Sequence, residues 1–360
     1  MSAADPGVTS GPGAPGAAAW ADLVRLDRLG PALAEALGDE GWRAPSAALV
    51  SGGKSNLTFE VSSPAGVVIL RRPPSGELLP SAHDMGREAR AQRALRGTAV
   101  PVAEVLLEDP TGELIGAPFY VMEKVEGHVV RASLPAGYAA SAADKVAMAD
   151  ALVDTLVALH AVDPASAGLA DHGRPTGFLE RQVRRWNGQW EKSRTRDVPA
   201  VDELGRRLAA ALPTSQGAAI VHGDYRLDNC LMHPTDPGRV AAVLDWELST
   251  LGDPLTDVGL LLFYWREPGE AEPALTPAVT GTPGFPGRAH LAERYVAATG
   301  ADLGDLAFYE AFAHYKFAVI AQGIAARAAA GVMAGQEFGD LDSEVARIAE
   351  DGLHRLAQEG

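Results

Sequence analysis

The chain has 360 residues, enough to bury a large core and to form two lobes or domains. Hydrophobic residues make up 47% of it and the mean hydropathy is −0.01, values typical of a soluble globular protein. Its formal net charge of −16 argues against a general nucleic-acid binder and against a binder of anionic membranes, because basic surfaces are needed to contact phosphate groups. No apolar stretch is long enough to cross a bilayer.

The single cysteine, Cys230, excludes an intramolecular disulfide and favours a reducing compartment. Residues 1–19 contain no lysine, arginine or apolar run, so we expect no signal peptide there, and their proline, glycine and alanine bias predicts a disordered tail. The cytoplasm is therefore the expected location. The sequence leaves the oligomeric state open, a homodimer included.

The first predicted element is a helix over residues 20–37 that ends at Gly38, a typical C-cap residue. Residues 42–124 have mostly strand character, interrupted by one helix at about 83–96. Two hairpins are expected, one turning at 63–66 between strands 57–62 and 67–70, and one turning at 109–112 before a strand at 119–122.

After Gly127 the pattern becomes helical. Met148, Leu152, Leu156 and Leu159 are spaced so that they form one apolar stripe on a helix. Further helices are expected near residues 178–192, 200–212, 287–299, 304–330 and 341–357.

A sheet followed by helices predicts an α+β protein of two lobes with a boundary near residue 125. The N-terminal lobe would be residues 20–125 and the C-terminal lobe residues 126–360. Within the second lobe, residues 266–287 are rich in proline, glycine and glutamate and are expected to form a long surface loop.

The stretch SGGKSNLT at 51–58 has the composition of a phosphate-binding P-loop. That motif fails because Ala48 stands where its first glycine is required, and because residues 56–62 predict a strand where a helix should follow. Two interpretations remain for the stretch by itself: an ordinary hairpin turn, which is favoured, or a glycine-rich flap between two strands of a kinase-like sheet.

The strongest chemical signal lies between residues 221 and 257. The segment VHGDYRLDN places Asp224 and Asn229 in one polar loop, and a strand-like run at 240–244 leads to Asp245 and Glu247. Phosphoryl transfer from a nucleotide needs one carboxylate near the accepting hydroxyl, and amide and carboxylate oxygens as ligands for Mg²⁺. This ordered set therefore predicts a phosphotransferase site.

At this point the chain resembles a known family, the aminoglycoside phosphotransferase and choline kinase-like group, which shares the bilobal protein-kinase fold. The resemblance covers about residues 49–353 and is best with the kinase modules associated with acyl-CoA dehydrogenases. The motifs that carry it are LRRPPSGELLPSAHDMGREA, RQVRRWNGQW, VHGDYRLDN, LDWELSTLGDPLTDVG and KFAVIAQGIAAR.

The resemblance implies a role for each matching residue. Asp224 resembles the catalytic aspartate, Asn229 and Asp245 resemble the two Mg²⁺ ligands, and Glu88 resembles the glutamate that anchors the phosphate-binding cation. That cation is usually lysine but is Arg71 here, whose planar fork can bridge phosphate and carboxylate. Contacts to ATP from the flap and the hinge are implied for Gly52, Gly53, Lys54, Ser55, Asn56, Met122, Glu123 and Val125.

The arginine leaves the phosphate-binding role divided between Arg71, Arg72 and Lys54. Supporting roles are expected for His222, by packing and hydrogen bonding, and for Asp257, which resembles the kinase aspartate that holds the catalytic loop. An aspartate before proline at 253–254 predicts a helix start. Glu247 would contact a metal or a substrate hydroxyl, with a surface salt bridge as the equal alternative.

A basic segment precedes the catalytic motif, with one glutamate among its charges. Its members are Arg181, Arg184, Arg185, Lys192, Arg194 and Arg196, with Trp186 among them. One interpretation is a solvated helix face, and the other is a receptor for an anionic acceptor, in which Arg181, Arg184, Arg185 and Trp186 contact the substrate. Polycationic aminoglycosides would instead require carboxylates, and the resemblance implies a hydroxyacyl-CoA acceptor.

The sequence therefore predicts an ATP- and Mg²⁺-dependent kinase that phosphorylates a small-molecule hydroxyl, with a hydroxyacyl-CoA as the leading acceptor. Two alternatives stay open: an aminoglycoside or other antibiotic phosphotransferase, and a nucleotide-binding pseudokinase. The identity of the acceptor and the preference between ATP and GTP are not determined by the sequence.

Overall fold

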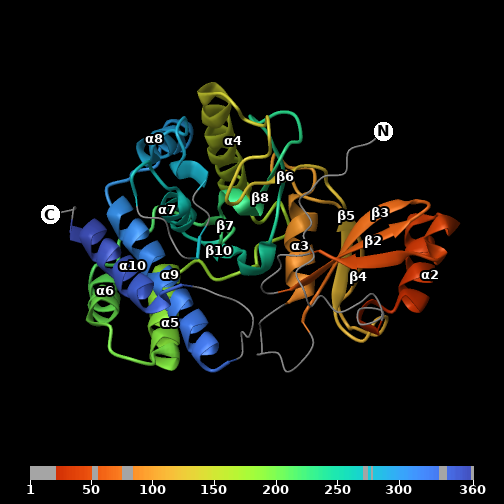
Figure 1. The fold of residues 1–360 in the computed structure, drawn as a ribbon, viewed down its shortest axis with the longest axis horizontal. Helices are drawn as coiled ribbons and strands as arrows, with labels where there is room; N and C mark the ends of the chain where they lie inside the picture. Colours follow the sequence, from red (N-terminus) through yellow and green to blue (C-terminus); the bar gives the residue numbers. More distant parts are fainter. Residues whose placement is uncertain are drawn as a thin grey trace. The chain divides into compact units, whose positions relative to one another are not determined.

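The computed structural model describes residues 22–50, 56–74, 84–270, 275–276, 279–331 and 339–357. Their internal contacts divide the chain into two units, the first ending at Arg93 and resuming over 103–124, the second made of 94–102 and the chain from Val125 onward. The α+β class is confirmed, since the first unit holds a sheet and the second is mostly helical (Figure 1). The single boundary expected near residue 125 did not anticipate that residues 94–102 group with the second unit.

The sheet of the first unit has five strands in the order β1-β2-β3-β5-β4, and every neighbouring pair is antiparallel. Both predicted hairpins are present. The strands are β1 (Ser46–Leu49), β2 (Leu57–Ser63), β3 (Gly66–Arg72), β4 (Val105–Asp109) and β5 (Phe119–Glu123).

Helices α2 (Leu26–Leu37) and α3 (Met85–Leu95) complete the first unit. Helix α2 ends as predicted at Gly38, which has φ 66° and donates its N–H to the carbonyl of Ala34. Residues 22–24 are helical as well, but Arg25 has the left-handed φ of 46° and interrupts the predicted helix.

Alternation along β3 and β5 assigns the two sheet faces to different partners. Leu70 and Val121 are buried in a core with Leu29 and Leu33 of α2. Their neighbours on β3 and β5 point to the other face of the sheet. That face is available for polar side chains that meet α3.

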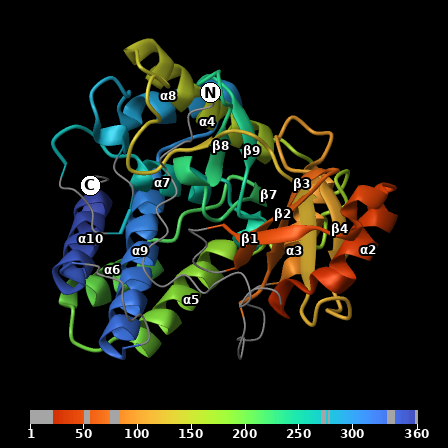
Figure 2. The ribbon, with the colours of Figure 1, turned by 45° about the vertical axis from the view of Figure 1, so that its right-hand side comes forward.

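The second unit contains α4 (Ala142–His160), which begins at a capping box between Ser141 and Asp144. The predicted stripe on α4 is confirmed, since all four of its residues are at most 1% exposed. The other helices are α5 (Phe178–Ser193), α6 (Pro199–Ala210), α7 (Leu255–Tyr264), α8 (Arg288–Thr299), α9 (Leu306–Ala329) and α10 (Leu341–Leu356). Helices α5 and α10 lie beside α9 (Figure 2).

Short strands set the loops of this unit in place. A three-stranded sheet has the order β6-β8-β9 and a two-stranded sheet pairs β10 with β7. The strands are β6 (His128–Val129), β7 (Ala219–Val221), β8 (Cys230–Met232), β9 (Val240–Val243) and β10 (Thr250–Gly252), with the 3₁₀ turns η2 (Leu227–Asn229) and η3 (Trp246–Leu248) between them.

The prediction of a surface loop at 266–287 is wrong for part of the residues that the structure describes there. A 3₁₀ turn, η4 (Val279–Gly281), buries Val279 to 4% exposure, and Phe285 is buried to 8%. These apolar side chains sit among many prolines and glycines, which hid them in the sequence pattern. None of the helices in the described part of the chain is both long and apolar enough to cross a membrane.

Two helical glycines offer a test of the packing of α7 against α9. A Cβ at Gly259 of α7 would lie 2.6 Å from the backbone of Tyr309, so Gly259→Ala must push the two helices apart. We expect it to lower the free energy of unfolding by about 1–3 kcal/mol. A Cβ at Gly323 of α9 meets only the end of Arg327, so Gly323→Ala should stabilise by up to about 1 kcal/mol. Equal effects in urea unfolding would contradict this packing.

Candidate functional site

The candidate catalytic loop connects β7 to β8 and carries Asp224. One oxygen of this carboxylate accepts a hydrogen bond from Asn229 Nδ2 at 3.0 Å, and the other accepts one from the Tyr264 hydroxyl at 3.2 Å. The Asp224 side chain keeps 24% of its surface exposed. The carboxylate is thus fixed in direction and still open to a substrate.

His222 connects this loop to the segment that leads to Asp245. Its Nδ1 accepts the backbone N–H of Asp224 at 3.2 Å, so its Nε2 carries the proton that is donated to the Leu244 carbonyl at 2.8 Å. Gly223 has φ 82°, and a Cβ there would lie 2.8 Å from the Leu248 carbonyl oxygen. Glycine is required here for both reasons.

The Asp257 side chain, fully buried on α7, holds the loop from behind. Its carboxylate accepts the backbone N–H of His222 at 2.6 Å and that of Gly223 at 2.8 Å. Burial by itself raises the pKa of this carboxyl, but the hydrogen bond and charge of His160, with the contacts to His222, outweigh burial and leave the pKa lowered. Asp257 stays ionised and fixes the loop backbone.

Asn229 and Asp245 are brought together through the backbone. The Leu244 N–H donates to the Asn229 carbonyl at 2.8 Å. Asp245 is the next residue along the chain, so this bond places it near Asn229. Both bonds of Asn229 Nδ2 go to Asp224, and among the described residues its Oδ1 accepts none. Asp245 has φ 66°, a left-handed conformation that costs a non-glycine residue about 1–3 kcal/mol and is typical of functional sites.

These two oxygen donors fit Mg²⁺, which binds few protein ligands and completes its shell with water and phosphate oxygens. In the part of the chain that the structure describes, no group of three His, Cys, Asp or Glu side chains could hold a metal ion by itself. A metal at Asn229 and Asp245 would therefore depend on a bound nucleotide.

In the first unit, Arg71 of β3 pairs with Glu88 of α3, with 3.2 Å between Nη1 and Oε1. Both side chains are buried, beside the hydroxyl of Tyr120, to which Gln92 donates at 3.0 Å. Burial and the nearby Glu88 charge hold the pKa of Tyr120 well above its usual range. The pair thus lies on the sheet face opposite α2.

Arg72 points the other way and contacts the backbone. It donates to the carbonyls of Leu23 at 2.5 Å and Pro73 at 3.1 Å, and burial lowers its pKa. The sequence left Arg72 open as one of three candidate phosphate-binding cations. Its hydrogen bonds instead hold the chain segment that precedes α2.

The remaining nucleotide contacts are only partly within the described residues. Gly52, Gly53, Lys54 and Ser55 lie outside them, whereas Asn56 is 2% exposed. In the expected hinge, Met122 is buried, Val125 is half-buried, and the Glu123 carboxylate accepts the N–H of Glu104 at 2.9 Å.

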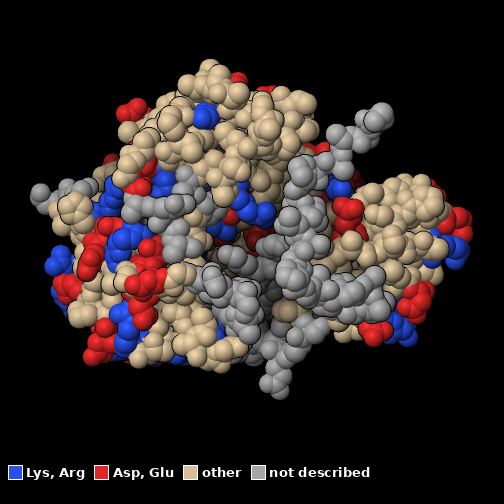
Figure 3. All heavy atoms as spheres, viewed as in Figure 1, with Lys and Arg blue, Asp and Glu red and all other residues tan. Residues whose placement is uncertain are grey.

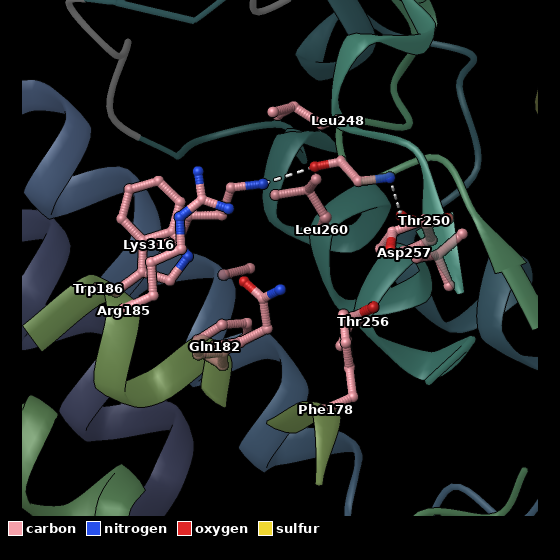
Figure 4. A pocket seen from close by; sticks show the side chains of 14 residues that line it. Phe178, Gln182, Arg185, Trp186, Leu248, Thr250, Thr256, Asp257, Leu260 and Lys316 are labelled. Carbon is pink, nitrogen blue, oxygen red and sulfur yellow. Dashed lines mark hydrogen bonds between the residues drawn. The ribbon is translucent and has the colours of Figure 1, made fainter. Parts of the chain in front are cut away.

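A pocket of about 650 Å³, its open mouth included, lies against the catalytic loop (Figure 4). Residues of α5, α7 and α9 line it, with Gly223 and Leu248 from the loops. Among the residues expected to bind substrate, Arg185 and Trp186 line this pocket, and the Arg185 guanidinium carbon lies 5.9 Å from the centre of the Trp186 ring. Glu247 lies in η3 and is half-buried.

Four other arginines of the basic segment have partners within the protein. Arg181 donates to the carbonyls of Arg174 and Thr176, and Arg184 is 71% exposed and 4.0 Å from Glu180. Arg194 pairs with Asp197 and Arg196 pairs with Asp342. Acidic and basic side chains are accordingly interspersed over the helical unit (Figure 3). The helix-face interpretation fits Arg181 and Arg184, whereas Arg194 and Arg196 follow the end of α5 at Ser193.

Two residues of the site were not singled out in the sequence. Lys316 of α9 donates to the Gly223 carbonyl at 2.6 Å, and burial lowers its pKa. Arg226 lies with its Nε 3.0 Å from Asp228 and 3.5 Å from Asp224, and its guanidinium carbon is 4.7 Å from the centre of the Tyr264 ring. Their signals were the motifs KFAVIAQGIAAR and VHGDYRLDN themselves.

A fold with a sheet unit that buries an arginine–glutamate pair, and a helical unit that presents an aspartate and an asparagine on one loop, is that of a kinase-like phosphotransferase. Residues 46–309 match the family described as "Phosphotransferase enzyme family", and the chain belongs to this family. The description of the family assigns its members to the phosphotransferase enzymes.

Individual proteins agree with this membership. Acyl-CoA dehydrogenase family member 11 of Gallus gallus is 37% identical over 310 residues, covering 84% of this chain but only 39% of that protein. The chain thus spans well under half the length of the curated relatives it matches.

Solved structures give the same fold. A protein of Ralstonia eutropha JMP134, provisionally called an aminoglycoside phosphotransferase, is 36% identical with a TM-score of 0.75, covering 87% of this chain and 93% of that one. A thermostable mutant of aminoglycoside phosphotransferase APH(4)-Ia, in complex with ADP and hygromycin B, has a TM-score of 0.58 at 17% identity, covering 92% and 98% of the two chains, and shows the fold alone.

Asp257 gives a prediction with a defined pH dependence. Since its folded pKa lies below the ordinary value of 3.8, its stabilising effect is complete above about pH 4 and is lost as the pH falls through the folded pKa. Asp257→Asn should lower the free energy of unfolding by about 2 kcal/mol at pH 7. The difference from the wild type should shrink below pH 4. The exposed Asp197→Asn serves as control, and a difference independent of pH would contradict the assignment.

Proposed function

We propose that the protein is an ATP- and Mg²⁺-dependent kinase that transfers the γ-phosphoryl group to a hydroxyl of a small molecule. The observation that carries the proposal is the Asp224–Asn229 pair, in which the amide nitrogen orients the carboxylate and the amide oxygen stays available to a cation. The family membership and an ADP complex of a protein with this fold agree with a nucleotide as phosphoryl donor.

In the proposed reaction, the acceptor oxygen bonds to the γ-phosphorus while the bond from that phosphorus to the β,γ-bridging oxygen breaks. ADP leaves, and the hydroxyl proton goes to Asp224. Because the transition state is loose, Asp224 contributes mainly by orienting the hydroxyl. Asn229 and Asp245 would hold Mg²⁺, which neutralises charge on the phosphate oxygens when bound. Arg71, oriented by Glu88, would contact the phosphates.

For the acceptor we propose a hydroxyacyl-CoA. The pocket beside the catalytic loop carries the cations of Arg185 and Lys316, which suit an anionic acceptor. Among its described lining residues the one carboxylate is that of Asp257, which is occupied by the backbone N–H groups of the loop, so the pocket is poorly suited to a polycationic aminoglycoside. The name of the Gallus gallus relative also refers to acyl-CoA chemistry.

A screen of hydroxyacyl-CoAs, sugars and aminoglycosides with labelled ATP, read by mass spectrometry, tests this proposal. We expect a phosphorylated hydroxyacyl-CoA. A phosphorylated aminoglycoside would replace the acceptor class and keep the kinase. ATP binding with no turnover on any acceptor would favour the pseudokinase alternative.

The proposed roles predict different kinetic losses for two carboxylates. Asp224→Asn should lower turnover by roughly three or more orders of magnitude and leave ATP affinity nearly unchanged, because it orients the acceptor. Asp245→Asn should remove the Mg²⁺ dependence of nucleotide binding. Asp154→Asn, on the exposed face of α4, is the control. Full activity in the Asp245 variant, with the fold kept, would refute its assignment as a metal ligand.

Arg71 and Lys54 can be distinguished by the same assay. Arg71→Ala should reduce turnover far more than Lys54→Ala, because the buried pair with Glu88 fixes the guanidinium in one direction. A greater loss in the Lys54 variant would make that lysine the principal phosphate ligand.

A further inference from the structure

The Lys316 side chain is half-buried, and its ammonium group is only partly satisfied by hydrogen bonds. Of its three donors, one reaches the Gly223 carbonyl at 2.6 Å. The charges of Asp224 and Asp257 act on it, but among the described residues no carboxylate is recorded within ion-pair distance, and the Trp186 ring lies 5.8 Å away. A half-buried cation with no directly bound carboxylate is stabilised by an anionic ligand that reaches it.

A second cation lies at the same indole. The Arg185 guanidinium carbon is 5.9 Å from the centre of the Trp186 ring, and Arg185 also makes no ion pair with the described residues. Two like charges that share one aromatic ring repel each other. A negative charge bound near both would turn this repulsion into attraction. In Figure 4 both side chains lie next to Trp186 at one end of the pocket.

The remainder of the pocket is mainly apolar, with Gln182, Thr250 and Thr256 as polar members, and Asp257 carries the only carboxylate among its described lining residues. Phe178, Leu248, Leu260 and Phe312 line it. The carboxylate of Asp257 is held by two backbone N–H groups and by His160. The pocket therefore combines a cationic end with apolar walls.

We infer that Lys316, Arg185 and Trp186 form an anion subsite, which receives a carboxylate or phosphate group of an amphipathic ligand whose apolar part lies along the walls. Identifying this ligand as the acceptor rests on the proposed kinase function. The anion subsite is connected directly to the loop that carries Asp224, because Lys316 donates to the carbonyl of Gly223, the residue that precedes Asp224. Lys316 is thus a specificity-determining residue.

Binding measured by calorimetry tests the subsite without requiring turnover. The probes are 3-hydroxydecanoate, its uncharged methyl ester, and 3-hydroxydecanoyl-CoA. The acid should bind the wild type more tightly than the ester does. Lys316→Gln should weaken binding of the anionic probe by about ten- to a hundredfold, because a desolvated charge pair is lost. Weakening of the CoA ester alone would identify phosphate as the source of the charge.

Two further variants separate charge from structure. Lys316→Arg keeps the charge and should retain most of the binding. Lys145→Gln is a matched control, since Lys145 also donates to a carbonyl, that of Pro283 at 2.6 Å, and lies 5.5 Å from the centre of an aromatic ring, but it belongs to α4 and does not line the pocket. It should have no effect on any probe.

Unchanged binding of both anionic probes in the Lys316→Gln variant, or no binding of either anionic probe to the wild type, would overturn the subsite. Titration with Mg²⁺ and ADP separates this outcome from a failure of the kinase proposal. If the wild type binds the nucleotide but shows no anion effect, the subsite alone is refuted. If the wild type does not bind the nucleotide, the kinase proposal is refuted.

Discussion

The buried carboxylate of Asp257 is the constraint on which the rest of the site depends. It accepts the backbone N–H groups of His222 and Gly223, two consecutive residues, and so fixes the start of the catalytic loop. A buried charge of this kind is stable only when it is fully hydrogen-bonded. His160, on α4, supplies the further contact, so that the loop, α4 and α7 are joined at one point.

From that point the arrangement spreads in two directions. His222 and the Asn229 carbonyl bind the backbone of Leu244, which positions the segment that carries Asp245. On the other side, the Gly223 carbonyl accepts from Lys316 of α9. The backbone N–H and the carbonyl of Gly223 are therefore both held by charged side chains. A ligand that binds at Lys316 would act one residue away from Asp224, the proposed catalytic residue.

Much of this could be predicted from the sequence, because the signals were local. Strand alternation, the α4 stripe and the loop motif with Asp224 each lie within a few residues of one another. Lys316 could not be predicted in the same way, since its function depends on how α9 packs against a loop almost a hundred residues earlier in the chain. For the basic segment, composition suggested one surface, but helical geometry separates Arg185 from Arg184 and sends them to different neighbours.

The central claim, phosphoryl transfer to a hydroxyl, is tested most directly with ATP whose γ-phosphoryl oxygens carry ¹⁸O. The protein, Mg²⁺ and a pool of hydroxyacyl-CoA esters that differ in hydroxyl position would be incubated and analysed by mass spectrometry. The account predicts a phosphate monoester that carries the labelled oxygens and keeps the acceptor's own oxygen, with one ADP formed for each product. Label found only in inorganic phosphate, or retained entirely in ATP, would contradict it.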